Sequence, residues 1–144
     1  MRMIDDHTGI EELAVDECER LLGAYKLGRL ALASAGPAIF PVNYVMADSD
    51  VVFRTADGPI LRATAMRERV AFEVDMADVD AGVGWSVLVK GELDEVDDAL
   101  DIERLASLDL HPWSPGKSHW VRLRTKELTG RRIVHIAPDR KSVV

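Results

Sequence analysis

The chain has 144 residues, of which 47% are hydrophobic and 30% charged, and its formal net charge is −7. This is the length of one ordinary domain, and no apolar run approaches the roughly 18 residues of a membrane span. The acidic balance disfavours nucleic acid as a partner, while the single cysteine, Cys18, fits a reducing compartment, so we expect a cytoplasmic protein without nucleic-acid or membrane partners.

The first part of the chain predicts a tail followed by a helix. Residues 1–12 are polar, and we expect a loose tail or arm there. Across residues 13–25, apolar side chains recur every three or four positions, which is typical of an amphipathic helix. Gly28 is suited to the left-handed conformation that ends many helices.

After Gly28 the hydrophobic period changes to two. Residues 28–36, 37–50 and 51–58 predict three short strands, and Gly36-Pro37 and residues 47–50 are turn signals between them. Pro41 cannot donate a ladder hydrogen bond, so its strand is expected at an edge or with a bulge.

The second half of the chain alternates helices and longer strands. Pro59 favours the start of a short helix over 59–68, and strands are expected over 70–78 and 84–96. Asp97 or Asp98 can cap a third helix, residues 108–118 predict a long loop, and 119–136 predict one or two final strands before a frayed tail. Short consecutive strands with hairpin-length turns favour an α+β fold with an antiparallel barrel core at about 13–136 in a single domain, 1–144.

Eight strings lie along this element order. They are GRLAL (28–32), IFPVNYV (39–45), VVFRT (51–55), AFEVD (71–75), GWSVLVKGE (84–92), HPWSPG (111–116), HWVRLR (119–124) and LTGRRI (128–133). As an ordered set they resemble the pyridoxamine 5′-phosphate oxidase-like family of FMN-binding split barrels, with its nitroimidazole-reductase-like and deazaflavin-reductase-like branches. The resemblance implies an antiparallel split β-barrel with short flanking helices, working as a homodimer with FMN between the subunits.

The same resemblance implies where the cofactor lies. The second strand would pass along the isoalloxazine ring and offer backbone groups to it, through Pro41, Val42, Asn43 and Tyr44. Arg54 and Thr55 would lie at the phosphate or ribityl chain. Trp85 and Ser86 would reach the flavin from the partner subunit, and Arg131, with Arg132, would border the substrate.

The residues themselves support a phosphate site near Arg54. A guanidinium can bind a phosphate through two hydrogen bonds, and Thr55 precedes the helix start at Pro59, where an anion is favoured. One feature departs from the family, whose members carry a basic pair, Gly-Thr-Lys or Gly-Ser-Lys where this chain has residues 58–61, GPIL. Arg62 is the nearest replacement cation, with Arg67 and Arg69 further along.

The remaining candidates are weaker. The four histidines are spread along the chain and show no zinc spacing, so no metal site is expected, and haem ligation by His119 is disfavoured. The sequence therefore predicts an FMN-dependent oxidoreductase that acts on a small-molecule substrate, without naming its catalytic side chains. A deazaflavin-dependent reductase and a non-catalytic flavin-binding or storage module, or an apo relic, stay open as alternatives.

Overall fold

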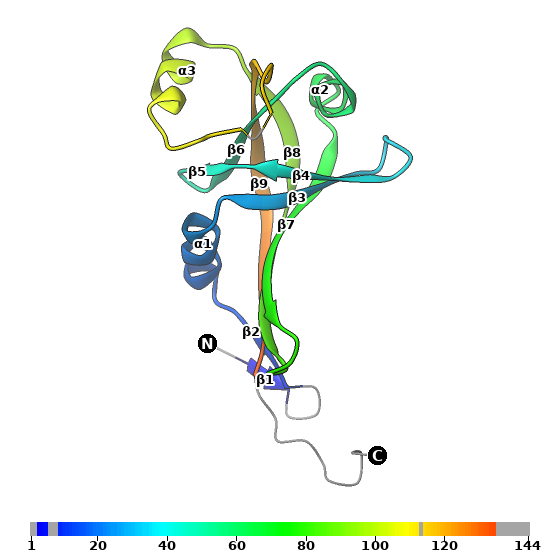
Figure 1. The fold of residues 1–144 in the computed structure, drawn as a ribbon, viewed down its shortest axis with the longest axis vertical. Helices are drawn as coiled ribbons and strands as arrows, with labels where there is room; N and C mark the ends of the chain where they lie inside the picture. Colours follow the sequence, from blue (N-terminus) through cyan, green and yellow to red (C-terminus); the bar gives the residue numbers. More distant parts are fainter. Residues whose placement is uncertain (1–2, 6–8, 113, 135–144) are drawn as a thin grey trace, which may run out of the picture.

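The computed structural model describes residues 3–5, 9–112 and 114–134. Within these ranges one curled antiparallel sheet is flanked by three short helices, α1 (Val15–Ala24), α2 (Pro59–Ala65) and α3 (Ala99–Ala106) (Figure 1). The strands are β1 (Met3–Asp5), β2 (Ile10–Glu12), β3 (Leu27–Leu32), β4 (Ala38–Asn43), β5 (Val45–Ala47), β6 (Asp50–Thr55), β7 (Arg69–Asp78), β8 (Val83–Val96) and β9 (His119–Ile133). This arrangement confirms the predicted antiparallel split-barrel α+β fold.

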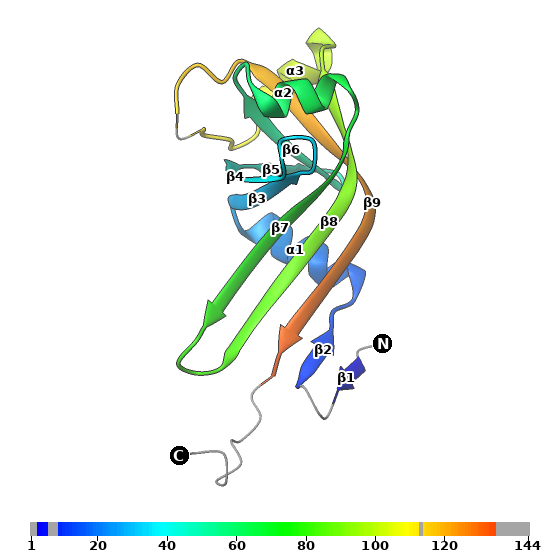
Figure 2. The same ribbon diagram turned by 90° about the vertical axis from the view of Figure 1, so that its right-hand side faces the viewer.

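The sheet runs in the order β1-β2-β9-β8-β7-β3-β4. The β5–β6 hairpin joins it through β6, which pairs with the first third of β9 and so curls the sheet towards a half-barrel. The far ends of β7, β8 and β9 run on past the barrel as a long ribbon (Figure 2). In the described part of the chain, no helix is long and apolar enough to cross a membrane.

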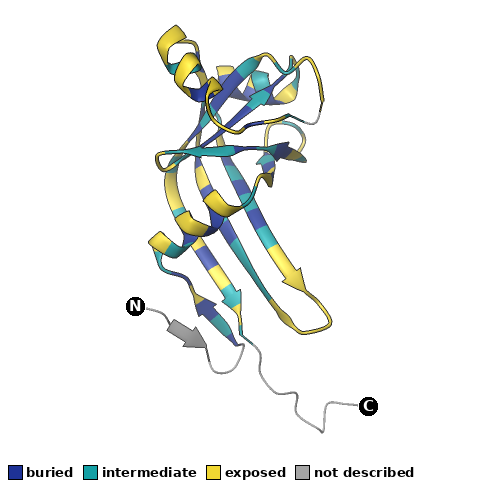
Figure 3. Cartoon of the chain, turned by 60° about the vertical axis from the view of Figure 1, so that its left-hand side comes forward, coloured by how far each residue is buried: buried dark blue, intermediate teal, exposed yellow. Residues whose placement is uncertain are grey.

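The main core lies between the curled sheet and α1. Cys18, Leu21 and Leu22 form the buried stripe of α1, and the alternating apolar residues of the strands face them (Figure 3). A Cβ atom on Gly130 of β9 would lie 2.5 Å from the sulfur of Cys18, so the helix can approach β9 only over a glycine. Cys18 is therefore a packing residue, as its position on the apolar face predicts, and burial raises its pKa.

A second, smaller core lies on the outer side of the barrel, beneath α3. Trp120 of β9 and Val52 of β6 pack there against Leu105 of α3 and Leu110 of the following loop. The predicted loop over residues 108–118 is thus anchored at Leu110, which is 8% exposed.

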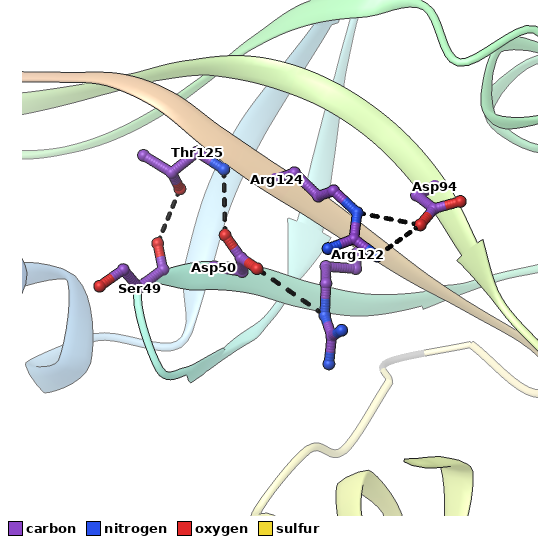
Figure 4. Close-up of polar contacts among 6 residues, drawn as sticks. All are labelled: Ser49, Asp50, Asp94, Arg122, Arg124 and Thr125. Carbon is purple, nitrogen blue, oxygen red and sulfur yellow. Dashed lines mark hydrogen bonds and ion pairs between the residues drawn. The ribbon is translucent and has the colours of Figure 1, made fainter. Parts of the chain in front are cut away.

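A polar junction fixes the β5–β6 turn to β9 (Figure 4). The backbone N–H of Thr125 donates to Asp50 at 3.0 Å, and the Thr125 hydroxyl donates to the Ser49 carbonyl at 2.7 Å. Beside them the Arg124 guanidinium donates to Asp94 of β8 at 3.0 and 2.8 Å. Next to this junction the pairing of β8 and β9 shifts register at Lys90 and Gly91, so these contacts hold the strands where the ladder is irregular.

Two expectations for the N-terminal quarter are wrong. Residues 1–12 do not form only a loose tail, because Ile10–Glu12 pairs with the end of β9 and Met3–Asp5 pairs with Ile10–Glu12. Gly28 does not end α1 in a left-handed conformation. It lies inside β3, where a Cβ atom would be 2.1 Å from the Phe72 ring, so its role is close packing.

The other element predictions need smaller changes. The second helix ends at Ala65, three residues early, and Asp98 occupies the N-cap position of α3 without a side-chain capping bond. Residues 119–133 form one strand rather than two, and Pro41 lies on an edge strand as predicted. The frayed tail expected over residues 138–144 lies outside the described residues.

Candidate functional site

The edge strand β4 presents part of its backbone away from the sheet. Among the described residues β4 pairs with β3 alone, and the Tyr44 N–H donates to the Lys26 carbonyl at 3.0 Å. Because antiparallel pairs alternate, the backbone groups of Ile39, Pro41 and Asn43 are directed to the outer edge. This edge is where the sequence predicts backbone contacts to a ligand.

Val42 and Tyr44 support that edge from behind. Val42 is 7% exposed and Tyr44 is 1% exposed. The Tyr44 hydroxyl donates to the Leu22 carbonyl at 2.5 Å, and its ring meets Phe72 edge-on with 5.0 Å between centroids. Burial raises the pKa of Tyr44, so the phenol keeps its proton. Both side chains therefore position β4, and Tyr44 also borders the cavity described below.

Arg54 and Thr55 are neighbours on β6, and their side chains lie on opposite faces of it. The Arg54 guanidinium lies 5.2 Å from the Trp120 ring centroid on the outer side, and its buried Nε finds no hydrogen-bond partner among the described residues. Thr55 is 5% exposed, and its hydroxyl donates to the Ala56 carbonyl at 3.2 Å. Arg54 can thus still bind a ligand, but the structure does not bring the side chains of Arg54 and Thr55 into one pocket.

The predicted phosphate-side helix is short and its cations are exposed. Gly58 precedes Pro59 with φ of 154°, and α2 has seven residues. Arg62 is exposed on this helix, and Arg67 and Arg69 are exposed beyond its end. Any of these cations would have to reach a phosphate by swinging in from solvent.

Trp85 and Ser86 also lie on opposite faces of their strand. Trp85 packs against Tyr25 with 5.1 Å between ring centroids, and it borders a surface pocket with Met76 at the base of the ribbon. Ser86 lies on the other face, directly across from Asp75 of β7 and from the exposed Arg131 of β9. Arg132, the neighbour of Arg131, is held by Glu17 of α1 at 2.6 Å.

A cavity of about 430 Å³ opens beside Asn43 at the edge of β7. It exists because the pairing of β3 with β7 ends at Arg29 and Glu73, so the first residues of β3 and residues 74–76 of β7 face each other without a ladder. The rest of its wall comes from the start of β3 and from the segment after α3, whose Asp109 is ion-paired with Lys26. Its volume is that of a small-molecule site.

An arginine and two carboxylates form a cluster at this cavity, with Arg29 and Asp75 on its wall and Glu73 beside it. Arg29 of β3 lies 3.6 Å from Glu73 and 3.4 Å from Asp75, both on β7. Burial and the neighbouring Asp75 raise the pKa of Glu73 to about 7, against the opposing effect of Arg29. Sequence reasoning missed this cluster, because charged residues at alternate strand positions look like any solvated face.

His119 has a local role. Its ring nitrogens lie 3.1 Å from Glu95 and 3.2 Å from Asp57, and these carboxylates, Glu95 first, raise its pKa. Over the ranges that the structure describes, no cluster of His, Cys, Asp or Glu is arranged to hold a metal ion.

Comparison with known proteins adds three relatives and one family. The family profile of pyridoxamine 5′-phosphate oxidase matches residues 14–143. The chain is 36% identical over 133 residues to the uncharacterized protein Rv0080 of Mycobacterium tuberculosis, covering 87% of this chain and 86% of that one. Among solved structures, the FAD binding protein from Mycobacterium smegmatis is 39% identical with a TM-score of 0.71, covering 84% of this chain and 98% of that one. The DIP1874 protein of Corynebacterium diphtheriae is 32% identical with a TM-score of 0.72, covering 88% and 99%.

Proposed function

Because the chain belongs to the pyridoxamine 5′-phosphate oxidase family of split barrels, we propose that it is a flavin-dependent oxidoreductase, active as a homodimer on a small molecule in the cytoplasm. The FAD-binding relative from Mycobacterium smegmatis supports the flavin, since the identity of 39% extends over 84% of this chain.

The open edge of β4 beside the cavity carries this proposal. It offers outward backbone groups from Ile39 to Asn43 next to a space of about 430 Å³. The rim of a flavin ring carries alternating hydrogen-bond donors and acceptors, which an exposed strand edge can match without any particular side chain. These residues therefore fit the group, and a bound flavin would supply the redox chemistry.

The chain's own residues would bind and orient the cofactor. β4 would hold the ring, and Arg54, whose Nε lacks a described partner, would bind a phosphate. FMN is the flavin that the family resemblance implies, while the FAD-binding relative favours the longer dinucleotide; the two share the isoalloxazine ring and the first phosphate.

A partner copy is supported by apolar side chains left uncovered on one copy. Ile39 on β4 is 68% exposed and Ile133 on β9 is 48% exposed, and the strand registers place both on the sheet face that carries Glu73. Uncovered apolar side chains along a sheet mark an interaction surface. We therefore propose that a second copy covers part of the sheet and completes the flavin site.

A second candidate function is flavin binding or storage without catalysis. One observation favours it: Arg54 and Thr55 lie on opposite faces of β6, and Arg62 is exposed on α2. Phosphate ligands spread out in this way suit a weakly held, exchangeable cofactor.

One titration tests these proposals together. The purified apo chain is titrated with FMN, FAD and the deazaflavin coenzyme. Light scattering measures the mass of the protein, which gives its oligomeric state. The loaded protein is then tested for electron transfer to small acceptors. We expect tight binding of FMN or FAD to a dimer. Preference for deazaflavin would change the cofactor, binding without turnover would favour storage, and a colourless chain that none of the three alters would refute the flavin proposal.

A further inference from the structure

We propose that Glu73 and Asp75 form a proton-holding carboxyl pair beside the cavity, and that this pair delivers the proton consumed when a bound molecule is reduced. The proposal rests on the flavin-dependent function above, and it assigns a role to two residues to which the family resemblance assigned none.

The geometry begins with strand alternation. Glu73 and Asp75 stand two residues apart on β7, so their side chains share one face, while Phe72 and Val74 fill the core on the other. Asp75 and Arg29 line the cavity. Glu73 lies one pleat further along the same face, in a shallow hollow that it shares with Ser86. The pair therefore connects the cavity wall with the solvent side of the sheet.

Among the described residues, Arg29 of β3 is the cation within 4 Å of the pair, and it contacts both carboxylates. Further charged groups share the sheet face or the cavity wall with the pair: Lys90, Arg131, Lys26, Asp109 and His111. The nearest β4 residue, Pro41, carries no charge. Two adjacent carboxylates resist simultaneous ionisation, so Asp75 favours the protonated form of Glu73.

The raised pKa of Glu73 suits proton transfer near neutral pH. Burial and the hydrogen bond to Asp75 raise the pKa of Glu73 to about 7. A general acid works best when its pKa lies near the operating pH, because much of it is then protonated and the proton is still readily transferred. Arg29 cannot fill this role, since its guanidinium does not release a proton.

The chemistry balances for a polarised double bond, such as that of a conjugated carbonyl compound. A bound reduced flavin would supply a hydride to a carbon of the substrate, and the Glu73–Asp75 pair would supply one proton to the other end of the double bond. The π bond would be replaced by one C–H bond and one further bond to hydrogen, and both electrons would come from the flavin. The pair, now carrying one more negative charge, regains a proton from water on the open face.

The first test uses the apo protein and needs no activity. Carboxyl carbon NMR is followed against pH for the parent, Glu73→Gln, Asp75→Asn and, as a control, Glu92→Gln, which removes an exposed carboxylate of β8. We expect a near-neutral titration that disappears in Glu73→Gln, moves to lower pH in Asp75→Asn, where only the raising effect of burial is left, and stays in Glu92→Gln. Titration of Glu73 in the ordinary range in the parent chain would overturn the proposal.

The second test uses the flavin-loaded dimer. The flavin is photoreduced, and its reoxidation by 2-cyclohexenone is followed in a single turnover over a range of pH. General acid catalysis is worth roughly 10²–10⁴-fold, so we expect Glu73→Gln to be slower by about 10²-fold or more, with unchanged flavin affinity and without the alkaline fall of the parent. The Glu92→Gln variant should match the parent.

The two proposals fail in different ways. A chain that binds no flavin overturns the proposed function and, with it, proton delivery to a reduced substrate. A chain that binds and reduces flavin normally, but whose Glu73→Gln variant reoxidises at the parental rate with the parental pH profile, overturns only the role of the carboxyl pair.

Discussion

The hydroxyl of Tyr44 donates a hydrogen bond to the backbone carbonyl of Leu22 at 2.5 Å. Leu22 lies in the last turn of α1, where carbonyls have no partner within the helix. Tyr44 directly follows β4, the strand whose outer edge forms the candidate site. One contact therefore satisfies the end of the helix and fixes the position of the site strand.

Replacing Tyr44 with Phe should destabilise the fold without changing the ligand site. The Leu22 carbonyl would be left buried and without a donor, which costs about 1–3 kcal/mol of the free energy of unfolding. Urea denaturation measures the loss, and a flavin titration of the folded variant should match the parent. A variant as stable as the parent would show that the bond contributes nothing; a variant with weakened flavin binding would place the phenol in the site.

Replacing Gly28 with Ala should be strongly destabilising, because the new Cβ would lie 2.1 Å from the Phe72 ring, which is fully buried in the core. Overpacking of this kind costs about 1–3 kcal/mol. Gly23→Ala is the matched control, since nothing lies within 4 Å of a Cβ there and alanine favours the helix by up to about 1 kcal/mol. Thermal unfolding should move in opposite directions for the two variants, and equal shifts would contradict the close packing at Gly28.

Replacing Glu73 with Gln should change how stability depends on pH. The folded chain holds this proton more tightly than the unfolded chain, since the pKa of Glu73 rises from its ordinary value of 4.5 to about 7. The stability that the folded chain gains by holding this proton is complete below the pKa of Glu73 in the unfolded chain. It is lost as pH rises through about 7. Unfolding free energies of parent and variant should therefore diverge in favour of Gln between about pH 5 and pH 8. A constant difference would contradict the raised pKa.

Replacing Arg54 with Ala should weaken flavin binding at least about tenfold, the effect of losing one charge-assisted contact. The guanidinium also lies over Trp120, so a circular dichroism melt must accompany the titration. Arg104→Ala on α3 is the control, because Arg104 is exposed and paired with Asp101. An unchanged affinity in a folded Arg54→Ala chain would remove Arg54 from the site.

Local patterns predicted much of the fold because they report short-range geometry. The spacing of Cys18, Leu21 and Leu22 sets the face of α1, and the alternation in β7 sets which residues enter the core. Pro41 marked an edge strand because a proline cannot donate to a ladder. The same patterns gave a wrong prediction for Gly28. In the sequence, a glycine that leaves room for the ring of a distant residue cannot be told from one that ends a helix.

The site depended on contacts that no local pattern contains. Arg29 and Asp75 are 46 positions apart, and they meet only because β3 pairs with β7 and this pairing ends at Arg29 and Glu73. Arg54 and Thr55 were expected to hold one phosphate together, yet strand alternation sends their side chains to opposite faces.

The sequence by itself thus determined the elements, the fold family and the strand that carries the candidate site, because each follows from hydrophobic period, turn residues and ordered motifs. The tertiary structure alone decided the cavity beside Asn43, the sharing of Arg29 by two carboxylates and the burial of Tyr44. The physical reason is register: a cavity and a shifted pKa arise where strands distant in sequence begin and end against each other.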